Sequence, residues 1–267
     1  MAQPPGFVDP QFPGHVCKLH KAIYGLKQSP QQWYNKLTTQ LQAEGFHFSK
    51  SDPALLILKT VSAQIYILIY VDDMLITGND PQQIQDILSK LQTVFPLEEP
   101  TPLSLFLGIR TSTKLYGLFL DQQQYAQDIL NSSGFLNCKP LLTPIALKSS
   151  SPAKPGLQHI DPPHYRQLAG SLQYLTITQP DIAFATNQIC QHMHDPKQIH
   201  LQTLKRLLRY IQGIINFGLL IRRSNLTLQS YIDAYWASDQ IDRKSISGSA
   251  HSSDTISSLG PLKSRLQ

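Results

Sequence analysis

The chain has 267 residues, a length that fits one large domain or two small ones. Hydrophobic residues make up 41% of it, which argues against a wholly disordered chain, and its 19 prolines exclude a long uninterrupted helix or coiled coil. The formal net charge of +5 suits a polyanionic partner such as nucleic acid but does not require one.

Two helices are predicted from their start signals. Ser29, followed by Pro30 and by Gln32 three residues later, predicts a capping box, and this helix should end at Gly45. Asp80, with a proline directly after it, predicts the start of a second helix.

A hairpin of strands is predicted between these helices. The apolar stretch Ile65–Val71 is followed at once by Asp72 and Asp73, so it is far shorter than the roughly 20 apolar residues that a membrane span needs. Together with residues 74–77 it predicts two strands joined by an acidic turn. We expect both faces of this hairpin to be largely covered, with the turn facing the helix that begins at Pro30.

The second half of the chain predicts mostly helices. A further hairpin over residues 103–110 and 115–120 precedes a helix that Asp121 should cap, and residues 139–163 are a Pro- and Ser-rich loop. From residue 226 the alternation of apolar and polar residues predicts strands, which we expect to be marginally packed. Between the loop and these strands, helices are predicted at about 163–178, 181–193 and 196–212.

The adjacent carboxylates of Asp72 and Asp73 allow two interpretations. Aspartate is common in plain solvated turns because it forms local hydrogen bonds. Alternatively, two carboxylates on a rigid hairpin can hold Mg²⁺, which prefers oxygen ligands and is usually bound by one or two carboxylates plus substrate phosphates. Composition alone leaves both interpretations open.

Motifs along nearly the whole chain favour the second interpretation. They are AIYGLKQSPQQWY (22–34), IYILIYVDDMLITG (65–78), FLGI (106–109), CKPLLTP (138–144), YRQLAGSLQYLTITQPDI (165–182), LKRLLRYIQG (204–213), and YIDAYWA with RKSISG (231–248). In this order, the set resembles the reverse transcriptase region of copia-type retrotransposon Pol polyproteins. The stretch 65–78 is similar to the catalytic hairpin of that family.

The resemblance implies an α+β fold, namely a reverse-transcriptase palm with an antiparallel sheet and packed helices that lacks its N-terminal part. A helical thumb and connection and a truncated ribonuclease H-like strand region would follow. The implied boundaries are a partial palm with both hairpins at 1–120, a thumb helix and loop at 121–160, connection helices at 161–225 and the ribonuclease H-like segment at 226–267.

The activity implied by the resemblance is RNA-directed DNA polymerisation, a nucleotidyl transfer in which a primer 3′-hydroxyl attacks a nucleotide α-phosphate with Mg²⁺ or Mn²⁺. The implied partners are an RNA template, a DNA primer and the remaining parts of the Pol polyprotein. The implied location is inside the cell, in a cytoplasmic particle or the nucleus.

Specific residues receive roles from the same resemblance. It assigns catalysis and metal binding to Asp72 and Asp73, contact with the nucleotide or template to Gln28 and Tyr70, and the primer grip to Leu107 and Gly108. Judged without it, Gln28 is an exposed residue before a helix, and Leu107 and Gly108 belong to an ordinary strand with a bulge glycine.

Departures from the family pattern make us expect incomplete active sites. The family carries a further catalytic aspartate upstream of the segment that resembles Gln3–Phe7, so we expect that residue to lie outside this chain. Asp233 occupies the first ribonuclease H carboxylate, but Tyr235 replaces the next one. We therefore expect this chain alone to be inactive, Asp233 to be non-functional and Mg²⁺ not to bind tightly. The alternative is a decayed, non-enzymatic remnant or a weak nucleic-acid-binding protein.

A group of sulfur and imidazole side chains, Cys190, His192, His194 and His200, offers a competing zinc hypothesis. Helical positions i, i+2 and i+4 do not share one face, so we expect these to be ordinary helix-end residues. The three cysteines of the chain are odd in number and far apart, which predicts no disulfide framework and fits a reducing compartment.

Basic side chains gather on one predicted helix, at Lys205, Arg206 and Arg209. They can form a solvated face near the helix C-terminus, where cations are favoured by the helix dipole. They can equally follow the phosphate backbone of an RNA–DNA hybrid.

Overall fold

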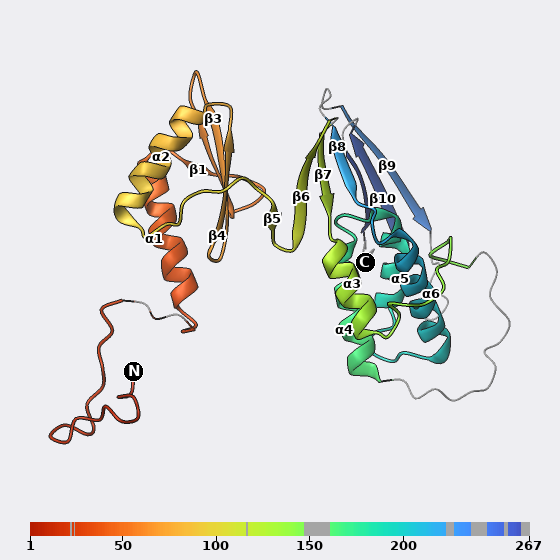
Figure 1. The fold of residues 1–267 in the computed structure, drawn as a ribbon, viewed down its shortest axis with the longest axis horizontal. Coiled ribbons are helices and arrows are strands. Elements are labelled where there is room, and N and C mark those ends of the chain that lie inside the picture. Colours follow the sequence, from red (N-terminus) through yellow and green to blue (C-terminus); the bar gives the residue numbers. More distant parts are fainter. Residues whose placement is uncertain are drawn as a thin grey trace. The chain divides into compact units, whose positions relative to one another are not determined.

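The computed structural model describes residues 1–21, 23, 25–115, 117–146, 161–222, 227–235, 245–253 and 256–262. The chain divides into two compact units, Met1–Pro102 and Leu103–Gln267. Both combine helices with antiparallel sheets, which agrees with the mixed α and β class predicted from the sequence (Figure 1). Among the described residues, no helix combines the length and the apolar character needed to cross a membrane.

The first unit is a four-stranded antiparallel sheet with two helices. The strands follow in the order β1-β2-β3-β4. Figure 1 shows both helices on one side of this sheet. The elements are α1 (Ser29–Ala43), β1 (His47–Phe48), β2 (Leu55–Lys59), β3 (Gln64–Tyr70), β4 (Asp73–Gly78) and α2 (Pro81–Val94).

Alternation along β3 separates a covered from an open face of this sheet. Ile65, Ile67 and Ile69 are buried and pack with apolar side chains of α1 and α2. On the other face Tyr66 and Leu68 are only half-buried and Tyr70 is exposed. The expectation that both faces are largely covered therefore fails at Tyr70, because the helices pack against one side of the sheet only, as antiparallel sheets allow.

The two predicted helix starts differ in outcome. The Asp80 carboxylate accepts the backbone N–H groups of Gln82 and Gln83, so the predicted cap of α2 is confirmed. Ser29 does not cap α1, whose N-cap residue is Gln28 without a side-chain bond. The Ser29 hydroxyl instead donates to the Ile23 carbonyl at 2.6 Å, and Ser29 is itself the first residue of the helix.

The second unit contains helices and two further antiparallel sheets, ordered β5-β6-β7-β8 and β11-β10-β9. Its helices are α3 (Gln123–Ser132), α4 (Pro162–Leu175), the short 3₁₀ helix η1 (Pro180–Ile182), α5 (Ala183–Cys190) and α6 (Gln198–Ile214). Its strands are β5 (Leu105–Phe106), β6 (Ile109–Lys114), β7 (Gly117–Asp121), β8 (Leu219–Arg222), β9 (Leu228–Tyr235), β10 (Ile246–Ser253) and β11 (Ile256–Leu262).

Two features of the second unit depart from the expectations, whereas the strands predicted after residue 226 are present. The predicted strand over 103–110 is split by a tight turn between β5 and β6. Strand β8 was not predicted and pairs with β7, about a hundred residues earlier in the chain. The segment after residue 226 forms three paired strands, β9 to β11. Most of the predicted Pro- and Ser-rich loop, at 147–160, lies outside the described residues.

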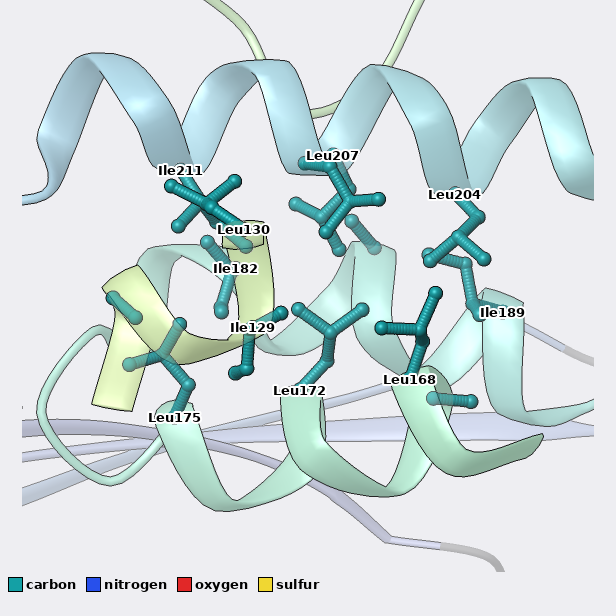
Figure 2. Packing of buried hydrophobic residues seen from close by; sticks show 14 of the residues in the cluster. Ile129, Leu130, Leu168, Leu172, Leu175, Ile182, Ile189, Leu204, Leu207 and Ile211 are labelled. Carbon is teal, nitrogen blue, oxygen red and sulfur yellow. The ribbon is translucent and has the colours of Figure 1, made fainter. Parts of the chain in front are cut away.

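Helices α3 to α6 enclose the core of the second unit. Figure 2 shows side chains of α4 pointing towards those of α6, with residues of α3, η1 and α5 filling the space between them. Their spacing of three or four residues along each helix places them on one face, as the sequence pattern predicts. The labelled core residues are Ile129, Leu130, Leu168, Leu172, Leu175, Ile182, Ile189, Leu204, Leu207 and Ile211.

Candidate metal-binding hairpin and nucleic-acid contacts

The acidic turn is the tight connection between β3 and β4. Tyr70 pairs with Asp73 across the hairpin, so only Val71 and Asp72 lie between the strands. The Asp72 and Asp73 side chains are both exposed. Val71 has φ +51°, which is unusual for a β-branched residue. This left-handed residue allows the chain to reverse within two residues between β3 and β4.

A tryptophan from α1 supports this strained turn. The Trp33 indole N–H donates to the Val71 carbonyl oxygen at 3.1 Å, and its ring meets Phe95 edge-to-face with 5.2 Å between centroids. The turn therefore faces the helix that begins after Gln28, as predicted. The apolar pattern of the helix places Trp33 on its buried face, but its hydrogen bond to the turn was not predicted from the sequence.

The carboxylates of the turn have no cationic partner among the residues that the structure describes. The described ion pairs are Lys90–Glu44 and Arg110–Asp121, and neither includes a residue of the turn. The described residues also contain no cluster of three or more acidic, His or Cys side chains that could hold a metal. Two carboxylates offer the oxygen ligands that Mg²⁺ prefers but fill only part of its octahedral shell.

Tyr70 and Gln28 are both exposed, at different places in the first unit. Tyr70, with 54% of its surface accessible, lies directly opposite Asp73, so the two side chains share the open face of the sheet. An exposed aromatic ring beside a carboxylate can stack on a nucleobase. Gln28 lies at the N-cap of α1, where its amide makes no capping bond.

The predicted primer-grip residues form the turn between β5 and β6. Phe106 pairs with Ile109, which leaves Leu107 and Gly108 as the connection. Their φ angles are +50° and +74°, the two positive values that a type I′ turn requires. The phenol O–H of Tyr174, in α4, donates to the Leu107 carbonyl.

The basic side chains of α6 are half-buried and bound to protein. Arg206 donates from Nη2 to the Thr143 hydroxyl at 2.6 Å, and Arg209 donates from Nε to the Lys139 carbonyl at 2.8 Å. These guanidinium groups therefore fasten the loop after α3 to α6. This arrangement differs from the freely solvated face considered from the sequence, and it leaves Arg206 and Arg209 only partly available to nucleic acid.

The Cys and His side chains near α5 and α6 make local contacts. His192 and His200 stack with 3.6 Å between ring centroids, beside a cavity of about 290 Å³ that Tyr165 also lines. The Lys197 backbone N–H donates to His200 Nδ1 at 3.0 Å, which occupies that ring nitrogen. Burial lowers the pKa of the His200 imidazole, helped by His192 and Lys197 and opposed by Asp195.

Asp233, the predicted ribonuclease H position, lies in β9 opposite Gly248. Its side chain is exposed, and its carboxylate accepts the backbone N–H of Ala234 at 2.8 Å. This is the ordinary environment of a polar residue on a strand.

Comparison with known proteins identifies the class of this chain. The model of the family "Reverse transcriptase (RNA-dependent DNA polymerase)" matches residues 1–147. The retrovirus-related Pol polyprotein from transposon RE1 of Arabidopsis thaliana is 44% identical over 93% of this chain. A second Arabidopsis Pol polyprotein, from transposon RE2, is also 44% identical over 93% of the chain. The chain therefore belongs to the reverse transcriptase family of copia-type retrotransposon Pol polyproteins.

The matched lengths differ among these relatives. The chain spans only 17% of the RE1 polyprotein. A putative transposon Ty5-1 protein of Saccharomyces cerevisiae is 30% identical, and the match covers 87% of this chain and 76% of that protein. No solved structure matches the chain significantly.

Proposed function

We propose that this chain supplies the metal-binding hairpin and part of the nucleic-acid surface for RNA-directed DNA polymerisation during retrotransposition. The observation that carries the proposal is the pair of exposed carboxylates, Asp72 and Asp73, on a turn held by Trp33. Carboxylate oxygens suit Mg²⁺ or Mn²⁺, and such ions stabilise the attacking and leaving oxygens of phosphoryl transfer when they are bound.

The residues around the turn have separate tasks in this proposal. Asp72 and Asp73 hold the cation together with nucleotide phosphates, and the exposed Tyr70 ring stacks on the nucleotide or template. The Gln28 amide, with no capping bond in the fold, donates or accepts hydrogen bonds at a base or sugar. Leu107 and Gly108 support the primer end.

The domain scheme extends this proposal to the whole chain. In this scheme residues 1–120, with both hairpins, correspond to part of the palm and residues 121–160 to the thumb helix and its loop. Residues 161–225 correspond to the connection helices and residues 226–267 to the opening of a ribonuclease H-like region. The partners are an RNA template, a DNA primer and other parts of the Pol polyprotein. The place of action is a cytoplasmic particle or the nucleus.

A polypeptide of residues 1–267 alone is expected to show no polymerase activity. The hairpin offers two carboxylates, and the described residues gather no third acidic group beside them, so two cations cannot be held in line for transfer. The assay is primer extension on an RNA template with Mg²⁺ or Mn²⁺, with an active reverse transcriptase as positive control. Nucleotide incorporation by this polypeptide that disappears in Asp72→Asn would overturn the expectation.

A further inference from the structure

Two non-glycine residues in the described part of the chain have positive φ angles, Val71 and Leu107. Each lies in one of the two turns to which the proposed function assigns a role. Each also has its carbonyl oxygen bound by an aromatic side chain of a helix in its own unit, Trp33 for Val71 and Tyr174 for Leu107. The shared arrangement indicates that each turn is held in place by a hydrogen bond from its own aromatic side chain.

The Leu107 backbone is costly without such support. Positive φ in a type I′ turn is normally supplied by Asn, Asp or Gly, and the Cβ of a leucine is disfavoured there by its contact with the following carbonyl oxygen. Strained residues of this kind persist only where their surroundings over-determine the conformation, and they cluster at functional sites. The hydrogen bond from Tyr174 is one such constraint, because it fixes the carbonyl group of the strained residue itself.

Tyr174 connects the turn to the packed helices of the second unit through its contacts. Its ring meets Tyr125 of α3 edge-to-face, with 5.4 Å between centroids. A Cβ added at Gly108 would lie 3.9 Å from Tyr174 Cε1, so the same ring also flanks the second residue of the turn. The turn thus rests on the α3–α4 pair, while Gly108 itself stays exposed.

We propose that Tyr174 is a positioning residue for the primer grip. Its phenol O–H donates a hydrogen bond to the Leu107 carbonyl and so fixes the conformation of the turn. In that conformation the exposed backbone of Gly108 faces the primer strand. The missing side chain at Gly108 lets a sugar-phosphate backbone approach closely. This inference rests on the proposed function, because it assumes that the turn contacts a primer–template hybrid.

Hybrid binding by the full chain tests the inference. Fluorescence anisotropy with a labelled DNA primer annealed to RNA measures the Kd of the unsubstituted chain and of Tyr174→Phe, which keeps the ring and removes the donor. We expect Tyr174→Phe to weaken binding by roughly 3- to 10-fold, the value of one lost hydrogen bond. Tyr165→Phe is the matched control, because it removes a phenol bond from the same helix, to the Ile189 carbonyl, away from the turn.

A second variant separates positioning from general stability. Asparagine tolerates positive φ, so the turn should keep its conformation in the double variant Leu107→Asn with Tyr174→Phe. This double variant should recover most of the binding that Tyr174→Phe alone loses. Equal Kd values for Tyr174→Phe and Tyr165→Phe, or no rescue by Leu107→Asn, would overturn the positioning role. Absence of hybrid binding by the unsubstituted chain would instead overturn the proposed function, and this inference with it.

Discussion

Leu172→Ala is expected to lower the free energy of unfolding of the second unit by roughly 2–5 kcal/mol. Leu172 lies in the middle of α4, is completely buried and points into the space between α4 and α6 (Figure 2). Truncation removes apolar burial and leaves a cavity that neighbours such as Leu207 can fill only in part. Native-state hydrogen exchange of the α4 and α6 amides measures this loss.

The control for this change is the same substitution on the surface. Leu142 is 96% exposed, so Leu142→Ala removes the same atoms without creating a cavity and should alter stability by less than about 0.5 kcal/mol. If both variants exchange their helix amides equally fast, Leu172 is not part of a tightly packed core, and the packing shown here is contradicted.

Arg110→Met is expected to destabilise the second unit by roughly 1–3 kcal/mol, because the carboxylate of the pair is buried while 58% of the Arg110 side chain is exposed to water. Arg110 Nε donates to both oxygens of Asp121 at 3.1 Å, and Asp121 is only 2% exposed. Methionine keeps much of the apolar stem but leaves this buried carboxylate without its cation, an uncompensated charge. Chemical denaturation followed by circular dichroism measures the effect.

Two further variants test whether the buried charge causes this loss. Lys90→Met breaks the other described ion pair, with Glu44, whose side chain is 20% exposed against 3% for Asp121. Because water still reaches the Glu44 carboxylate, this change should cost less than about 1 kcal/mol. Asp121→Asn combined with Arg110→Met removes both charges and can still accept the Gln123 backbone N–H, so it should recover most of the stability. A double variant as unstable as Arg110→Met would show that the buried charge is not responsible.

Local sequence signals predicted those elements whose causes are local. The Asp80 cap with its following proline determined the start of α2, and the apolar alternation of Ile65–Tyr70 determined β3. Strand β8 could not be predicted, because a segment of four residues, three of them apolar, gains a strand partner only when β7 lies beside it. The turn at Leu107 was missed for a similar reason, since its conformation depends on Tyr174, 67 residues away in sequence.

The candidate site was predictable to a similar extent. The motif located Asp72 and Asp73 at the tip of a hairpin, and the structure places them there. Neither the left-handed backbone of Val71 nor its bond from Trp33 could be deduced, because the two residues are 38 positions apart. The charge pattern likewise indicated a basic face on α6 but not that Arg209 binds the Lys139 carbonyl.

Binding of Mn²⁺ at the acidic turn is the most direct test of the central claim, that Asp72 and Asp73 hold a divalent cation. Mn²⁺ is paramagnetic and broadens nearby NMR signals even when it binds weakly. The chain has two tryptophans, so two indole N–H signals are expected, and Trp33→Phe assigns the one that lies at the Val71 carbonyl.

We expect Mn²⁺ to broaden the Trp33 indole signal of the unsubstituted chain selectively. The same should hold for Asp86→Asn, which removes an exposed carboxylate from α2 in the same unit. The effect should vanish in the double variant Asp72→Asn with Asp73→Asn, because both oxygen-ligand carboxylates are gone. Equal broadening in the double variant, or none in the unsubstituted chain, would contradict the assignment of a metal site to this hairpin.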